Sequence, residues 1–96
     1  MEEPVMKCAL GTRWNWSAYV KEGRTVYVIK AGERVYRVAR EGAHWRADVL
    51  GYPMWEALNS VHYRTPEGAA RAIVKLHKEY EWECTKERLT AQLGAL

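Results

Sequence analysis

The chain has no phenylalanine and little cysteine or proline. Among its 96 residues there are two Cys and three Pro, and the aromatic side chains are five Trp and six Tyr. Every aromatic side chain therefore carries a polar group, which suits half-exposed positions and binding surfaces as well as a core. Hydrophobic residues make up 48% and charged residues 28%, a balance that excludes a wholly disordered chain and predicts a single domain over residues 1–96.

Motifs that would identify a chemical reaction are also missing. Cys8 and Cys84 lie far apart in the sequence and have none of the short paired spacing that zinc sites use. The sequence contains no motif typical of a Ser-His-Asp triad and no glycine-rich phosphate loop. We therefore expect a protein that is not an enzyme and that holds neither a metal nor a cofactor.

The chain has neither a long apolar run nor a start typical of export. No apolar stretch reaches the roughly 18 residues that a membrane-spanning helix needs. The first residues include Glu2 and Glu3 and lack the basic-then-apolar order of a signal peptide. Since the cysteines are also too few for a disulfide framework, we expect a soluble, cytoplasmic protein with no membrane partner.

The net charge is small, but the charges are unevenly distributed. Fifteen Lys and Arg against twelve Asp and Glu give a net charge of +3 at pH 7. The stretch 21–46 is basic, whereas acidic residues gather at positions 79–87. Such a basic stretch permits an acidic partner such as nucleic acid without requiring one.

Residues 14–50 read as strands separated by short glycine turns. The strand-like runs are rich in Val, Tyr and Trp, and they cover residues 14–20, 24–30, 33–40 and 43–50. Glycine is expected as the second residue of each turn, at Gly23, Gly32 and Gly42. The pattern predicts a four-stranded antiparallel meander.

Two-residue turns at these places fix which residues lie opposite each other. In this register Ala18 pairs with Tyr27, and Arg37 lies directly opposite Arg46. One face then collects apolar side chains and is the expected core face: Trp16, Ala18, Val20, Tyr27, Ile29, Tyr36, Val38, Trp45, Ala47 and Val49.

A helix should follow the sheet and cover its core face. Thr65 as N-cap and Pro66 as the first helical residue predict its start. Apolar residues then recur at helical spacing, at Ala69, Ala70, Ile73, Leu76, His77 and Tyr80. We expect an α+β fold: the sheet over 14–50, a loop with a helical turn from Pro53 and a short extended piece over 51–64, a helix over 65–81 and a helical tail over 82–96.

The opposite, outer face of the sheet is the first candidate site. Two arginines directly opposite each other repel unless an anion bridges them. Asp48 or a hairpin-tip glutamate could be that anion, and a phosphate backbone would suit better. The expected nucleic-acid contacts are Tyr19, Lys21, Arg24, Arg37, His44 and Arg46. The alternative is a solvated face whose Lys and Arg side chains protect the sheet from aggregation.

Two stretches strengthen the nucleic-acid hypothesis by resemblance. Trp45-Arg46-Ala47-Asp48-Val49 and Tyr63-Arg64-Thr65-Pro66-Glu67-Gly68-Ala69-Ala70-Arg71-Ala72 resemble the plant ethylene-response-factor type of DNA-binding domain, to which the arm-binding domains of phage integrases are related. The resemblance covers about residues 35–80. It implies a sheet packed on one helix, with DNA contacts from Arg37 and Arg46 and with Asp48 as a further candidate.

Two other hypotheses involve protein partners. A small phage-type inhibitor or adaptor, anti-CRISPR-like, could bind a host nucleic-acid-processing protein. Its contacts would come from the loop and the acidic helix, at Tyr52, Met54, Trp55, Glu79 and Glu83. A homodimer could instead form through an apolar stripe of the tail, at Trp82, Leu89, Leu93 and Leu96.

Overall fold

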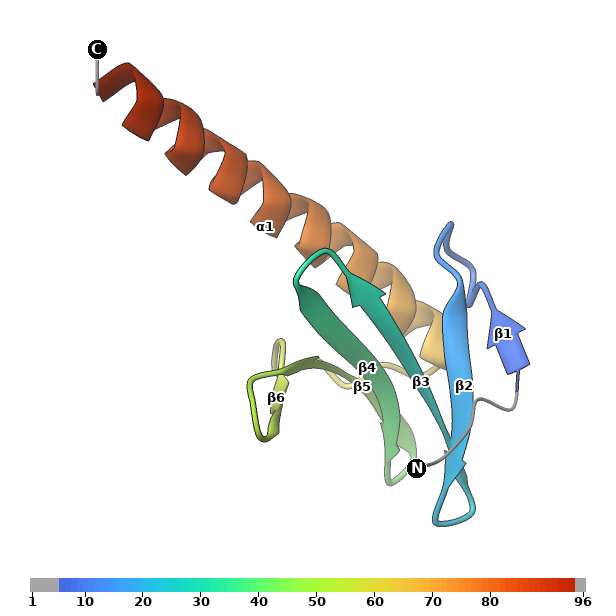
Figure 1. The fold of residues 1–96 in the computed structure, drawn as a ribbon. Coiled ribbons are helices and arrows are strands. Elements are labelled where there is room, and N and C mark those ends of the chain that lie inside the picture. The colour runs from blue at the N-terminus through green and yellow to red at the C-terminus, as the bar shows by residue number, and fades with distance from the viewer. Residues whose placement is uncertain (1–5, 95–96) are drawn as a thin grey trace.

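The computed structural model describes residues 6–94 and shows an antiparallel sheet packed against one long helix (Figure 1). The strands lie across the sheet in sequence order. The α+β class with a C-terminal helix is therefore confirmed, but the sheet has six strands where four were expected. The elements are β1 (Met6–Cys8), β2 (Trp16–Lys21), β3 (Arg24–Ala31), β4 (Arg34–Glu41), β5 (His44–Leu50), β6 (Trp55–Ala57) and α1 (Pro66–Gly94).

The two additional strands extend the sheet at its edges. β1 pairs with β2, and β6 pairs with β5. The helical turn expected from Pro53 is wrong, because the chain reverses there and returns as a strand. The amide of Gly51 donates a hydrogen bond to the carbonyl of Met54 at 2.9 Å, and this closes the turn. Trp55 then lies opposite Leu50 in the sheet.

The first hairpin turn is formed as the sequence predicts. Its central residues are Glu22 and Gly23, and both have positive φ, at 53° and 75°. Two successive positive φ values are typical of a type I′ turn, which matches the twist of the adjoining strands. The expected pairing of Ala18 with Tyr27 is confirmed.

The next two turns each begin one residue later than expected. Gly32 and Gly42, both with a φ of 62°, occupy the first turn position. Glycine at that position is typical of a type II′ turn. When a turn is displaced by one residue, each residue of one strand faces a residue two positions further along the other strand. Side chains therefore stay on the same face of the sheet but have different partners. The expected pairing of Arg37 with Arg46 is therefore wrong, and Arg37 lies opposite Asp48.

The inner face of the sheet is the core face, as expected. Its fully buried strand residues are Trp16, Ala18, Tyr36, Val38 and Ala47. Tyr27, Ile29, Trp45 and Val49 are partly buried and pack against them. Val20 is the exception, since it lies close to the β2–β3 turn and is 48% exposed.

The helix α1 begins at the expected residue. The Thr65 hydroxyl accepts a hydrogen bond from the amide of Gly68 at 3.1 Å, as an N-cap does. The helix then crosses the inner face over β4 and β5. Its buried residues all belong to the first half of the helix, at Ala69, Ala70, Ile73 and His77.

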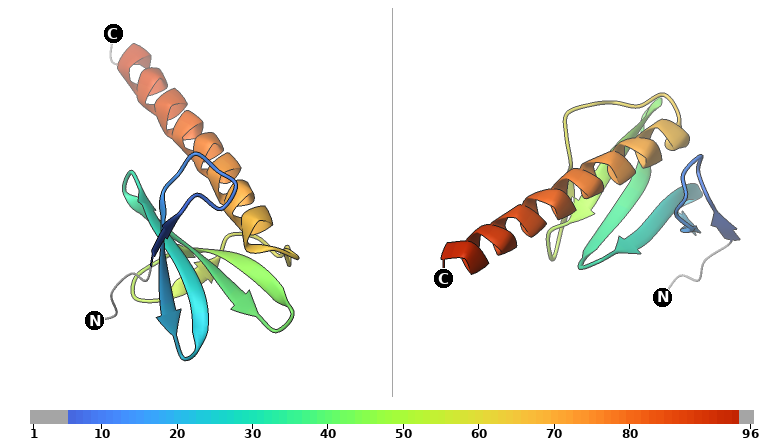
Figure 2. Two further views of the ribbon diagram at one scale, coloured as in Figure 1. Left: turned by 90° about the vertical axis from the view of Figure 1, so that its right-hand side faces the viewer. Right: turned by 90° about the horizontal axis from the view of Figure 1, so that it is seen from above.

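The second half of α1 projects away from the sheet (Figure 2). The helix is continuous over 29 residues, which at about 1.5 Å per residue is a length of about 43 Å. The expected tail thus continues the main helix as far as Gly94. Trp82, Leu89 and Leu93 are exposed along it. Leu96, the last residue of the expected stripe, lies outside the described residues.

Candidate nucleic-acid interface

The outer face is the side of the sheet that α1 leaves uncovered. Side chains alternate between the two faces of a strand, so the observed pairings assign each residue to a face. The charged strand residues of the outer face are basic at Lys7, Lys21, Arg24, Lys30, Arg37 and Arg46, and acidic at Glu41 and Asp48. Six basic side chains against two acidic ones leave this face with a net positive charge.

Asp48 organises the centre of the outer face. Its carboxylate is fully buried, and one oxygen accepts hydrogen bonds from Nε and Nη2 of Arg37 at 2.9 and 2.6 Å. The other oxygen accepts from Nε of Arg46 at 2.8 Å. The two arginines expected to need an external anion are therefore bridged by the protein's own carboxylate.

The surroundings of Arg37 and Arg46 restrain both side chains further. The ring of Trp55 lies over the Arg37 guanidinium, with 4.6 Å from its central carbon to the ring centroid. Arg46 also approaches Glu41 at 3.4 Å, and its hydrogen bond to Asp48 raises the pKa of its guanidinium above the ordinary value. Both guanidinium groups are thus held in place by contacts within the sheet.

The tip of the β2–β3 hairpin carries two of the expected cationic contact residues. Lys21 and Arg24 lie directly opposite each other and are exposed. Among the described residues, neither forms an ion pair. Tyr19 lies on the same face, opposite Val26, and is half-buried. The structure therefore brings together three of the six expected contact residues.

His44 lies apart from this group. The pairing of β3 with β4 ends at Tyr27 and Val38. Beyond that point the tips of the β2–β3 hairpin and the β4–β5 hairpin diverge (Figure 2). Between them is a cleft of about 350 Å³ that Arg24 lines from one hairpin. His44 lies in the other hairpin and is exposed, with its ring 5.8 Å from that of His62. The site residues expected from the sequence thus fall into separate groups.

The residues expected to bind a protein partner are also dispersed. Tyr52 and Met54 are 77% and 70% exposed in the β5–β6 connection. Trp55, their neighbour in sequence, instead packs on Arg37. Glu79 and Glu83 are exposed on α1. Of these five residues, Tyr52 and Met54 are the exposed apolar pair in one short connection.

Neither a metal-binding cluster nor a membrane-spanning helix is present within residues 6–94. Within that range, no group of three or more His, Cys, Asp or Glu side chains is placed to hold a metal ion. The helix of the described chain does not combine the length and apolarity needed to cross a membrane.

The bridging role of Asp48 was the main feature that sequence reasoning left undecided. Alternation along Trp45-Arg46-Ala47-Asp48 does place the carboxylate on the outer face. Deciding its partner required the turn type, because that sets which residue of β4 lies opposite. In comparisons with protein-family models, curated proteins and solved structures, nothing matches this chain significantly.

Proposed function

We propose that the protein is a small nucleic-acid-binding module that contacts phosphates through the outer face of its sheet. The observation that carries the proposal is the unneutralised pair Lys21 and Arg24. Two like charges directly opposite on a sheet are unfavourable, and a bound phosphate would relieve their repulsion. Glu22, in the turn between them, forms no ion pair with either within the described chain.

The rest of the outer face supports the same partner. Lys30 is exposed on this face, and Lys7 donates a hydrogen bond to the Ser17 hydroxyl at 2.6 Å. With Lys21 and Arg24 these cations make the outer face positive, and the half-buried Tyr19 lies on the same face. Such a surface attracts a polyanion over a distance and leaves one aromatic ring for contact with a sugar or base. The contacts of Arg37 with Asp48 and Trp55 stabilise the strands that form this surface.

A binding titration tests the proposal. Fluorescence anisotropy of labelled duplex and single-stranded oligonucleotides, at low and moderate salt, should show affinity that falls as salt rises. The double variant Lys21→Ala/Arg24→Ala should weaken binding about tenfold and lower the salt slope by about two phosphate contacts. Absence of binding to either probe at low salt would refute the proposal.

The matched control removes two exposed cations from the helix instead. Lys75→Ala/Arg88→Ala changes the net charge by the same amount, and both side chains are exposed on α1. This control should change the affinity for the oligonucleotides less than twofold, because a loss of net charge away from the site has only a small effect on binding. An equal loss in both double variants would show that net charge, and not the hairpin tip, governs binding.

A protein partner is the second candidate, and the exposure of Tyr52 and Met54 favours it. An inhibitor or adaptor that binds a host nucleic-acid-processing protein would use such an apolar projection as its anchor. Co-purification with the tagged chain should then yield a partner that Tyr52→Ser/Met54→Ser loses and Lys21→Ala/Arg24→Ala retains. If the Tyr52/Met54 variant retains the same proteins, this projection is not the anchor.

A second copy of the chain is a separate possible partner. Trp82, Leu89 and Leu93 are 59%, 51% and 71% exposed on the projecting helix. Truncation after Tyr80 removes these residues and keeps all four buried helix residues. Sedimentation should show a dimer for the full chain and a monomer for the truncated one. A dimer in both would exclude the tail as its cause.

A further inference from the structure

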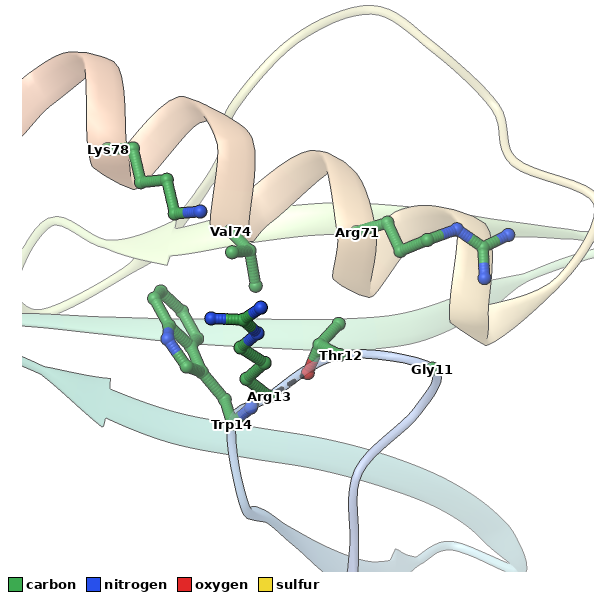
Figure 3. A pocket seen from close by; sticks show the side chains of 7 residues that line it. All are labelled: Gly11, Thr12, Arg13, Trp14, Arg71, Val74 and Lys78. Atoms are coloured by element: carbon green, nitrogen blue, oxygen red, sulfur yellow. Dashed lines mark hydrogen bonds between the residues drawn. The ribbon is translucent and has the colours of Figure 1, made fainter.

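We propose a second binding site, a cleft between the β1–β2 loop and α1 that takes a nucleoside phosphate. It lies on the helix side of the sheet, away from the outer face, and does not depend on the function proposed above. Its volume is about 310 Å³, near the lower limit for small-ligand sites. Figure 3 shows the lining residues: Gly11, Thr12, Arg13, Trp14, Arg71, Val74 and Lys78.

The loop that forms one wall is held in shape by its own hydrogen bonds. The Thr12 hydroxyl donates to the carbonyl of Ala9 at 2.7 Å. The same oxygen accepts from the amide of Trp14 and from the indole N–H of Trp16, both at 3.1 Å. The loop is therefore ordered before any ligand arrives, which lowers the entropy cost of binding.

Gly11 allows the loop and helix to approach closely. Its φ of 70° lies in the left-handed region, and a Cβ there would come within 2.9 Å of Nη1 of Arg71. Any larger residue would push against the guanidinium that lines this end of the cleft.

Trp14 provides a supported aromatic wall. Its ring centroid lies 5.4 Å from that of His77, 6.1 Å from Trp16 and 6.3 Å from Tyr36, so these residues fix its position from the core side. Figure 3 shows the indole on the loop side of the cleft and Val74 on the helix side, with the Arg13 side chain drawn between them. An indole and an aliphatic side chain provide apolar surfaces on which a planar base can pack.

Three cations line the cleft, and the Arg71 guanidinium lies at its Gly11 end. Arg13 comes from the loop, and Arg71 and Lys78 come from one side of α1. All three are exposed, and none forms an ion pair with another residue in the range 6–94. The acidic side chain of Glu67 lies beside Gly11, but it does not pair with Arg71 in the described chain.

The combination of charge and aromatic surface defines the ligand class. Guanidinium groups bind phosphate oxygens with paired hydrogen bonds, and Lys78 adds a point charge. Uncompensated cations alone would suit any anion, but the apolar surfaces of Trp14 and Val74 in the same cleft add a preference for an attached base. A nucleoside phosphate satisfies both parts, whether it is a free nucleotide or the phosphorylated end of a strand.

Calorimetric titration of the full chain with AMP, adenosine and inorganic phosphate tests this site. AMP should bind with a dissociation constant below about 1 mM, and adenosine and phosphate should each bind about tenfold more weakly. A 5′-phosphorylated single-stranded oligonucleotide is titrated in the same way. Comparison of its affinity with that of AMP distinguishes a strand end from a free nucleotide as the ligand. Failure of AMP to bind at about 1 mM would overturn the proposal, as would phosphate binding as tightly as AMP.

Variants assign the binding to this cleft. Arg71→Ala/Lys78→Ala should weaken AMP binding about tenfold, whereas the charge-matched Lys75→Ala/Arg88→Ala should leave it within twofold. Lys21→Ala/Arg24→Ala should also leave it unchanged, so this site and the outer face succeed or fail separately. Unchanged AMP affinity in Arg71→Ala/Lys78→Ala would place the ligand elsewhere and overturn the proposal.

Discussion

The two faces of the sheet each bury a polar group, but they satisfy it in different ways. Against the inner face, His77 of α1 is 3% exposed, and its Nδ1 lies 2.6 Å from the hydroxyl of Tyr36 in the sheet. On the outer face, Asp48 is fully buried between two arginines. The helix α1 covers the inner face. On the outer face, Asp48 bridges two arginines and Trp55 packs on one of them. An uncovered face can therefore be made rigid by ion pairs where a packed layer is absent.

The bonds of His77 follow from the chemistry of its neighbours. Its Nε2 lies 2.5 Å from a carboxylate oxygen of Glu81. Since a carboxylate only accepts, Nε2 donates to it, and in the neutral ring Nδ1 accepts from the Tyr36 hydroxyl. This contact joins β4 to the helix at the point where α1 leaves the sheet.

Of the changes to the two faces, removal of Asp48 should lower the stability of the protein most. Asp48→Ala leaves two partly buried guanidinium groups without their shared counter-charge, and the free energy of unfolding should fall by about 3–5 kcal/mol. Urea denaturation measures this loss. The control Glu41→Gln affects an exposed pair on the same face and should cost less than about 0.5 kcal/mol. A loss below about 1 kcal/mol for Asp48→Ala would show that the bridge does not stabilise the outer face.

Removing one hydroxyl from the inner face should have the next largest effect. Tyr36→Phe leaves Nδ1 of His77 buried without its hydrogen-bond partner, so stability should fall by about 1–3 kcal/mol. Tyr80→Phe is the matched control, because the Tyr80 side chain is 39% exposed. Chemical denaturation of both variants makes the comparison. Equal stability of Tyr36→Phe and the parent would contradict a stabilising hydrogen bond.

Alkaline pH should weaken the inner face through the same tyrosine. Burial raises the pKa of Tyr36 above the ordinary tyrosine value, and it raises the pKa of Tyr27 likewise. Above pH of about 10 the unfolded chain loses these protons while the folded chain retains them. Stability is therefore full below that pH and declines as pH rises toward the native pKa values. Urea midpoints between about pH 8 and 11 should fall less steeply in Tyr36→Phe, and identical slopes would refute this origin.

Removing the cover from Arg37 should have the smallest effect. Trp55→Ala removes the ring that lies 4.6 Å from the guanidinium, and stability should fall by about 1 kcal/mol. Met54→Ala, next to it in sequence and 70% exposed, should change stability by less than about 0.5 kcal/mol. Thermal unfolding followed by circular dichroism compares the two. A similar shift in both variants would mean that Trp55 contributes no more than an exposed loop residue.

The elements with strong local signals could be predicted from the sequence. Strands rich in Val and Tyr between glycine turns, and a helix beginning with Thr65 and Pro66, follow from local preferences. β1 and β6 could not be predicted in this way, since each has three residues and forms only by pairing with a longer neighbour. The error in register came from Gly32 and Gly42, whose position within the turn depends on the turn type.

The candidate sites were predictable to different degrees. Alternation within each strand, together with the two-residue turns that join the strands, assigned Lys21, Arg24 and Arg37 to one face. It could not show that Asp48 lies opposite Arg37 and so bridges Arg37 and Arg46. The cleft was beyond local reasoning altogether, because Arg13 and Arg71 come together only after the helix packs across the sheet.

The hairpin register has a consequence for the uniqueness of the fold. If β5 slipped by two residues against β4, Val38 would lie opposite Trp45. Each apolar side chain of the inner face would still remain on that face. Hydrophobic burial therefore discriminates weakly between the native pairing and this competitor. Asp48 discriminates strongly, because in the slipped pairing it would lie opposite Val35 and leave the two arginines facing each other. The carboxylate thus widens the energy gap between two arrangements of similar hydrophobic content, which selects one native state as well as stabilising it.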